Sequence, residues 1–168
     1  QERISALREE LAQTMPLADM TVERMRRTME VNVIGALLTA REAARRLGRG
    51  LDQPSASIVL VSSAAARLGA PGEYIDYAAS KGALDSLNIG LSKELAPKNI
   101  RVNAVRPGLI ETEIHASGGN PDRARNLSAS VPMGRPGQAE EVAEAILWLA
   151  SEQSSYVTGT NVEVTGGR

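Results

Sequence analysis

Cysteine and phenylalanine are both missing from this sequence, and aromatic residues make up only 2% of it. Without cysteine the chain can form no disulfide bond and can offer no thiolate nucleophile, which is typical of a reducing compartment. No stretch reaches the roughly 18 apolar residues of a membrane span, and the first residues lack the apolar core of a signal peptide. We therefore expect a soluble, cytoplasmic protein.

An excess of basic charge is missing as well. The formal net charge is −1 at pH 7 and the pI is near 6.0, so no nucleic-acid partner is expected.

The single histidine, His115, stands in a polar loop, and we predict no metal site. Two groups of arginines recur at helical spacing among glutamates: Arg24, Arg26 and Arg27, and Arg41, Arg45 and Arg46. They indicate solvated or interfacial helix faces.

The chain has 168 residues, of which 42% are hydrophobic, enough for one buried core and too few for two ordinary domains. Periodicity and turn residues predict helices over 1–14, about 21–47, 74–95 and about 139–151, strands over 57–63, 100–105 and 160–165, and a polar loop with a short helix over about 111–136. Asp19 or Thr21 would cap the second helix. Strands alternating with long helices indicate an α/β fold with a doubly wound parallel sheet.

In such sheets, ligands bind outside the carboxyl ends of the strands. Ser62 and Ser63 end the first predicted strand, and Pro107-Gly108 and Thr112 follow the second. Tyr77 opens the helix between these strands. The candidate chemistry therefore gathers at one edge of the sheet.

Tyr77 and Lys81 stand four residues apart, so on a helix their Cβ atoms lie about 5–6 Å apart. A charge pair at this distance interacts by roughly 3 kcal/mol at an effective dielectric constant of ~20, enough to lower the phenol pKa by about two units. Such a tyrosine would serve as a general acid/base near neutral pH. The alternative interpretation is a Tyr and a Lys that share a solvated helix edge.

Five segments in this order resemble a known family: "VNVIG" around Asn32, "VLVSS" ending at Ser63, "YAASK" from Tyr77 to Lys81, "IRVNAVRPGLIETE" over 100–113 and "GTNVEVTGG" over 159–167. They are similar to the carboxyl-terminal two thirds of the short-chain dehydrogenase/reductase family, over about residues 16–168. Within it, they look most like bacterial glucose 1-dehydrogenase-like and 3-oxoacyl-(acyl carrier protein) reductase-like members. The resemblance implies a single, partial Rossmann-like domain over 1–168, in which 1–15 form an unassigned helix.

The resemblance implies catalytic roles for four residues: Asn32, Ser63, Tyr77 and Lys81. Tyr77 would be the general acid/base on the substrate oxygen, and Lys81 would tune it and bond the nicotinamide ribose. Ser63 would hold the same oxygen. Ser62 is the competing choice, because alternation along the strand lets only one of the two face the site. Asn32 would orient a water that passes protons to Lys81, or it is a buried amide satisfied by neighbouring backbone.

The implied cofactor is NAD or NADP, and the residues implied to bind it are Tyr77, Lys81, Pro107, Gly108, Ile110 and Thr112. The backbone at Pro107-Gly108 would approach the nicotinamide, and Thr112 would offer a hydroxyl to its carboxamide. A Pro-Gly after a strand is otherwise a turn. Arg106 would contact a phosphate of substrate or cofactor, or lie on the surface.

The glycine-rich turn that binds a dinucleotide pyrophosphate has no match in this sequence, and neither has the family's "NNAG" segment. A shortened gene product, a proteolysed or engineered fragment and an incomplete sequence all stay open. The residues that distinguish NAD from NADP would fall in the same unmatched part.

Two functions are therefore predicted. The first is an NAD(P)-dependent oxidoreductase that interconverts a small-molecule secondary alcohol and a carbonyl, assembled as a homotetramer or homodimer as relatives commonly are. The alternative is a catalytically inactive fragment of this family that acts only as an assembly or binding module.

Overall fold

Strands and helices alternate through residues 13–112 and 123–168, the part of the chain that the computed structural model describes. The helices are α2 (Val22–Met29), α3 (Gly35–Arg46), α4 (Ala65–Leu68), α5 (Ile75–Leu95), α7 (Arg123–Asn126) and α8 (Ala139–Ala150), with a π-helical turn at Glu30–Ile34 and 3-10 turns at Leu17–Asp19, Ala96–Lys98, Ser128–Ser130 and Glu152–Ser154. The strands are β1 (Ala56–Val61), β2 (Ile100–Pro107), β3 (Ile110–Glu111), β4 (Gly137–Gln138) and β5 (Asn161–Val164).

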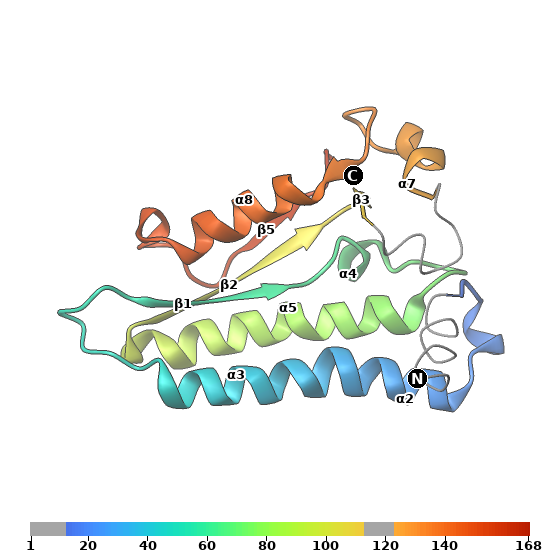
Figure 1. The fold of residues 1–168 in the computed structure, drawn as a ribbon. Helices are drawn as coiled ribbons and strands as arrows, with labels where there is room; N and C mark the ends of the chain where they lie inside the picture. The colour runs from blue at the N-terminus through green and yellow to red at the C-terminus, as the bar shows by residue number, and fades with distance from the viewer. Residues whose placement is uncertain (1–12, 113–122) are drawn as a thin grey trace.

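Three parallel strands form the main sheet in the order β1-β2-β5. Val61 is aligned with Val105 and Pro107 with Val164, so the carboxyl ends of the strands meet at one edge. Figure 1 shows α5 with the α2–α3 run on one side of this sheet and α8 on the other. The predicted α/β fold with a parallel sheet is confirmed. The pairing of β3 with β4 was not predicted.

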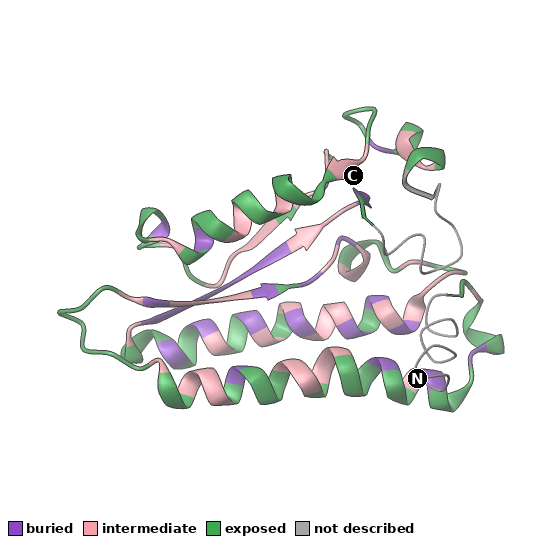
Figure 2. Cartoon of the chain, in the orientation of Figure 1, coloured by how far each residue is buried: buried purple, intermediate pink, exposed green. Residues whose placement is uncertain are grey.

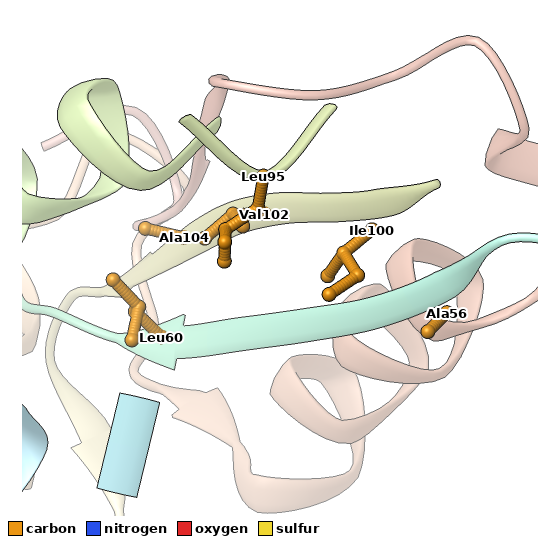
Figure 3. Packing of buried hydrophobic residues seen from close by; sticks show 6 residues of the cluster. All are labelled: Ala56, Leu60, Leu95, Ile100, Val102 and Ala104. Atoms are coloured by element: carbon orange, nitrogen blue, oxygen red, sulfur yellow. The ribbon is translucent and has the colours of Figure 1, made fainter. Parts of the chain in front are cut away.

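The apolar core lies between the sheet and the helices α3 and α5. Figure 3 shows six of its residues: Ala56 and Leu60 of β1, Ile100, Val102 and Ala104 of β2, and Leu95 of α5. Alternate residues of β2 point toward this core, as a pleated strand requires. Burial is concentrated on the strands and on α5, whereas the α2–α3 run exposes most of its length (Figure 2).

The other face of β2 is polar and is organised by Arg101, which is 6% exposed. Its guanidinium donates to the backbone carbonyls of Leu149 and Ser151, each at 2.9 Å, and to the hydroxyls of Ser154 at 2.8 Å and Ser55 at 2.9 Å. One side chain therefore ties the end of α8 to the sheet.

The long helix predicted over about 21–47 is continuous but not uniform, because the π-helical turn Glu30–Ile34 joins α2 to α3. Thr21 rather than Asp19 caps it, its hydroxyl accepting the N–H of Arg24 at 3.1 Å. The helix predicted over 1–14 lies almost entirely outside the described residues. Within the described part, no helix is both long and apolar enough to cross a membrane.

Candidate active site

The two serines after β1 face different ways. Ser62 is 2% exposed, and its hydroxyl donates to the backbone carbonyl of Lys81 at 3.1 Å. The hydroxyl of Ser63 accepts the N–H of Ala65 at 3.1 Å, and it lies close enough to the phenol of Tyr77 to lower the pKa of that phenol. The structure therefore brings Ser63, and not Ser62, to the phenol.

Tyr77 and Lys81 occupy the first two turns of α5. The Lys81 ammonium lies 5.5 Å from the centroid of the Tyr77 ring, and it donates to the backbone carbonyl of Val61 at 2.8 Å. Because Val61 is the last residue of β1, the phenol and the ammonium both lie at the carboxyl edge of the sheet. Neither side chain is on a freely solvated helix edge.

Burial opposes the ionisation of both side chains. It raises the pKa of the Tyr77 phenol, and the hydrogen bond with Ser63 lowers this pKa by less. Burial also lowers the pKa of the Lys81 ammonium, an effect that the Asp85 carboxylate partly offsets. The expected lowering of the Tyr77 pKa is therefore wrong for this structure, because burial of the phenol disfavours its charged form.

The raised pKa of Tyr77 fixes the sign of its effect on stability. The folded chain favours the neutral phenol, so this contribution is fully present below the ordinary phenol pKa near 10. It is lost as the pH rises through the higher pKa of the folded state.

Asn32 lies in the π-helical turn, a distortion often found at functional sites. Its amide Nδ2 donates to the Ser80 hydroxyl at 3.0 Å, and that hydroxyl donates to the backbone carbonyl of Tyr77 at 2.7 Å. The amide is thus satisfied by a side chain of α5 rather than by neighbouring backbone. Asn32 and Lys81 also line one open groove of about 330 Å³ between β1 and the α2–α3 run.

The segment implied to contact a cofactor lies just beyond β2. The Pro107 carbonyl accepts the N–H of Ala64 at 2.9 Å, which places it beside the turn that carries Ser63. A Cβ at Gly108 would lie 2.8 Å from the Cα of Thr165, so the close approach of the backbone just after β5 already requires glycine here. The Ile110 side chain is buried and that of Thr112 is exposed.

The Arg106 side chain is 18% exposed and forms ion pairs with two carboxylates of the same chain. Its guanidinium donates to Asp85 and to Glu163, each at 2.8 Å, and these partners, Asp85 first, raise the pKa of Arg106. The ion pair with the exposed Glu163 agrees with a position near the surface, and the phosphate contact stays a prediction.

A cluster next to the site was not predicted. Arg24 and Asp76 form an ion pair at 3.0 Å with side chains 1% and 3% exposed, and the Thr28 hydroxyl donates to the same carboxylate. The solvated face predicted for Arg24 is therefore wrong. Its only sequence signal is a charge on the helix face that also carries Thr28 and Asn32, and its partner lies 52 residues away.

Metal ligands do not gather in the described ranges, where no group of three or more His, Cys, Asp or Glu residues is placed to hold an ion. His115 falls outside the described residues.

Comparisons with known proteins identify the family of this chain. The family described as enoyl-(acyl carrier protein) reductase matches residues 5–168, beginning ahead of residue 16. The chain is 53% identical over 150 residues to the uncharacterized oxidoreductase YgfF of Escherichia coli K12, covering 89% of this chain and 61% of that protein.

Two solved structures from Brucella melitensis are also similar. A short-chain dehydrogenase/reductase, titled glucose/ribitol dehydrogenase, has a TM-score of 0.77 at 35% identity and covers 92% of this chain and 59% of that one. A 3-ketoacyl-(acyl-carrier-protein) reductase complexed with NADH has a TM-score of 0.85 at 31% identity and covers 93% and 62%. The chain thus spans between 59% and 62% of the length of these relatives. It belongs to the short-chain dehydrogenase/reductase family.

Proposed function

We propose that this chain carries the catalytic part of an NAD(P)-dependent oxidoreductase that interconverts a secondary alcohol and a carbonyl in a small molecule. The observation that supports this most is the meeting of the Tyr77 phenol with the Ser63 hydroxyl, with the Lys81 ammonium 5.5 Å from the ring. Proton transfer to a carbonyl oxygen needs a donor and a group that holds the oxygen in reach, and this pair supplies both.

Each residue has one role in the proposal. The Ser63 hydroxyl donates to the substrate oxygen, and Tyr77 gives a proton to that oxygen or takes it, according to direction. The Lys81 ammonium favours the phenolate that forms when the proton leaves, because an opposite charge nearby lowers a phenol pKa. Burial raises the pKa of the resting phenol, so the proton stays on Tyr77 until substrate arrives. Asn32 holds a water that exchanges protons with Lys81.

The residues present fit one end of a nicotinamide cofactor. The phenol and the ammonium are two polar donors side by side at the carboxyl edge of a parallel sheet, where this fold binds nucleotides. Tyr77 and Lys81 would hold the ribose, with the residues beyond β2 on the nicotinamide: Pro107, Gly108, Ile110 and Thr112. The bound cofactor would supply or accept the hydride. The NADH complex of the 3-ketoacyl reductase supports the proposal.

Cofactor titration tests the proposal on the 168-residue chain. We expect saturable binding of NADH or NADPH, followed by nucleotide fluorescence, and a Kd raised about 10- to 100-fold by Lys81→Met, since a charge-assisted hydrogen bond contributes about 1.5–3 kcal/mol. Lys93→Met is the matched control, because Lys93 is exposed on the same helix. Linear, non-saturable fluorescence curves with both NADH and NADPH would contradict the proposal for this chain.

The alternative function, an assembly or binding module without turnover, is favoured by a different observation. In the described part of the chain, β1 pairs only with β2, so its outer edge has no strand partner. The open groove lies along that edge. An unpaired edge beside an apolar groove accepts an added strand, and this function predicts the non-saturable curves.

We propose that the chain assembles with copies of itself through the α2–α3 run. Six large apolar side chains are exposed there: Val22, Met29, Val31, Ile34, Leu37 and Leu38. Apolar patches of this kind mark protein interfaces. Light scattering is expected to give a multiple of 17.8 kDa, and Leu37→Glu with Leu38→Glu to reduce the mass to that of one chain. A wild-type mass of 17.8 kDa at micromolar concentration would contradict self-assembly.

A further inference from the structure

The start of the helix that carries Tyr77 is fastened to α2 by a buried ion pair. Arg24 Nε donates to Asp76 Oδ2 at 3.0 Å and its Nη2 to Oδ1 at 3.4 Å, while the Thr28 hydroxyl donates to Oδ2 at 3.1 Å. Burial raises the pKa of Asp76, but the bonds from Arg24, the Tyr77 backbone and Thr28 outweigh it, so the net pKa is lowered. The carboxylate therefore stays charged.

Two residues of α5 that hydrogen-bond to the α2–α3 run lie on either side of Tyr77 in the sequence. Asp76 immediately precedes Tyr77, and Ser80, three residues after it, receives the amide of Asn32 at 3.0 Å. On the opposing run, Arg24, Thr28 and Asn32 follow one another at intervals of four. The ionic contact and the neutral contact thus set the position of the phenol relative to the helix of Asn32.

Stability alone does not explain a charged pair in this place. A buried ion pair is often no more stabilising than apolar side chains of the same volume, because both charges lose their hydration. The guanidinium differs from an apolar contact in its direction, since a planar fork fixes the orientation of the carboxylate that it binds. The distinctive property of the pair is therefore geometric.

We propose that Arg24, Thr28 and Asp76 are positioning residues that set the Tyr77 phenol in register with Ser63 and Asn32. The inference rests on the proposed role of Tyr77. It assigns these three residues no contact with substrate or cofactor.

The experiment compares single and paired replacements in the 168-residue chain. Arg24→Met leaves an unpaired buried carboxylate and is expected to lower the Tm by on the order of 10 °C. The double variant R24M/D76N has no unpaired charge, and its Tm is expected near that of the wild type. Because it removes one positive and one negative charge in contact, its direct electrostatic effect on the phenol is small.

The decisive measurement is the titration of the Tyr77 ring. The chain has three tyrosines, so ring-labelled tyrosine gives three NMR signals that Tyr→Phe variants assign. In R24M/D76N the Tyr77 pKa is expected to move by roughly half a unit or more toward its ordinary value near 10, because a displaced phenol loses its burial. The Ser63 hydroxyl and the Lys81 ammonium are unchanged in this variant. A stable double variant with the wild-type Tyr77 titration would overturn the proposal.

Two further variants complete the design. Thr28→Val removes a hydroxyl without changing charge, and it is expected to shift the same titration by a smaller amount. If the double variant does not fold, an unshifted Tyr77 in Thr28→Val overturns the proposal. Glu42→Gln with Arg45→Met breaks an exposed ion pair of the α2–α3 run, 41% and 64% exposed, and is expected to leave Tyr77 unchanged.

Kinetics separate this inference from the proposed function. In the protein expressed from its complete gene, R24M/D76N is expected to lower kcat about 10- to 100-fold with little change in KM, since small displacements of a reacting group are this costly. Unchanged kcat together with a shifted titration overturns the positioning role. Turnover that does not depend on Tyr77 at all would instead refute the proposed function, whatever the titration shows.

Discussion

Tyr77→Phe is expected to lower kcat by about 10²–10⁴-fold in the protein expressed from its complete gene, because a phenyl ring can pass no proton to the substrate oxygen. Absorbance of the reduced nicotinamide measures turnover on a panel of secondary alcohols and carbonyl compounds. The ring keeps its place and most of its contacts, so cofactor Kd is expected to change by no more than about tenfold, the loss of one hydrogen bond.

Tyr156→Phe is the matched control for this experiment. Tyr156 is fully exposed and follows the last helical turn before β5, so its hydroxyl has no part in the proposed chemistry. Its kcat and KM are expected to equal those of the wild type. A Tyr77→Phe enzyme with more than half of the wild-type kcat would refute the acid/base role.

Arg101→Met is expected to cost about 2–4 kcal/mol of the free energy of unfolding, since it leaves buried carbonyls without their donor. The guanidinium donates hydrogen bonds to the carbonyls of Leu149 and Ser151 and to the hydroxyl of Ser154. Methionine fills part of the volume but donates nothing. Urea unfolding should show a lower midpoint, and the Tm should fall by roughly 5–15 °C.

Arg46→Met provides the comparison for Arg101, because Arg46 has a side chain 79% exposed and only a long contact with Glu42 at 3.8 Å. It is expected to leave the urea midpoint within experimental error. Equal midpoints for the two variants would mean that the polar face of β2 does not depend on its guanidinium.

Much of the fold follows from the sequence for simple reasons. The helix predicted over 74–95 is observed at Ile75–Leu95, and the strand predicted over 57–63 ends two residues early at Val61. Turn residues and apolar periodicity mark such elements because each is long enough to complete several periods. β3 and β4 have two residues each, too few for any period, and their pairing depends on segments far apart in sequence.

The candidate site shows where sequence reasoning stops. Motif spacing brought Ser63, Tyr77 and Lys81 to one edge, because strand ends and helix starts are readable. The direction in which the Tyr77 pKa shifts could not be predicted from the sequence, since it depends on how much of the phenol the fold buries. The ion-pair partner of Arg24 could not be predicted either, because the residues around Arg24 in the sequence do not distinguish a buried arginine from its solvated neighbours.

The π-helical turn at Glu30–Ile34 makes the α2–α3 run one residue out of phase with a regular α-helix. Each residue of an α-helix advances the chain by about 100°, so the wide turn rotates α2 relative to α3. That rotation lets Arg24 and Thr28 face α5 while Ala40 is buried and Ala44 packs on the core. Deleting one residue from this turn would leave a more regular helix that cannot make both sets of contacts, so this segment tolerates substitution better than a change in length.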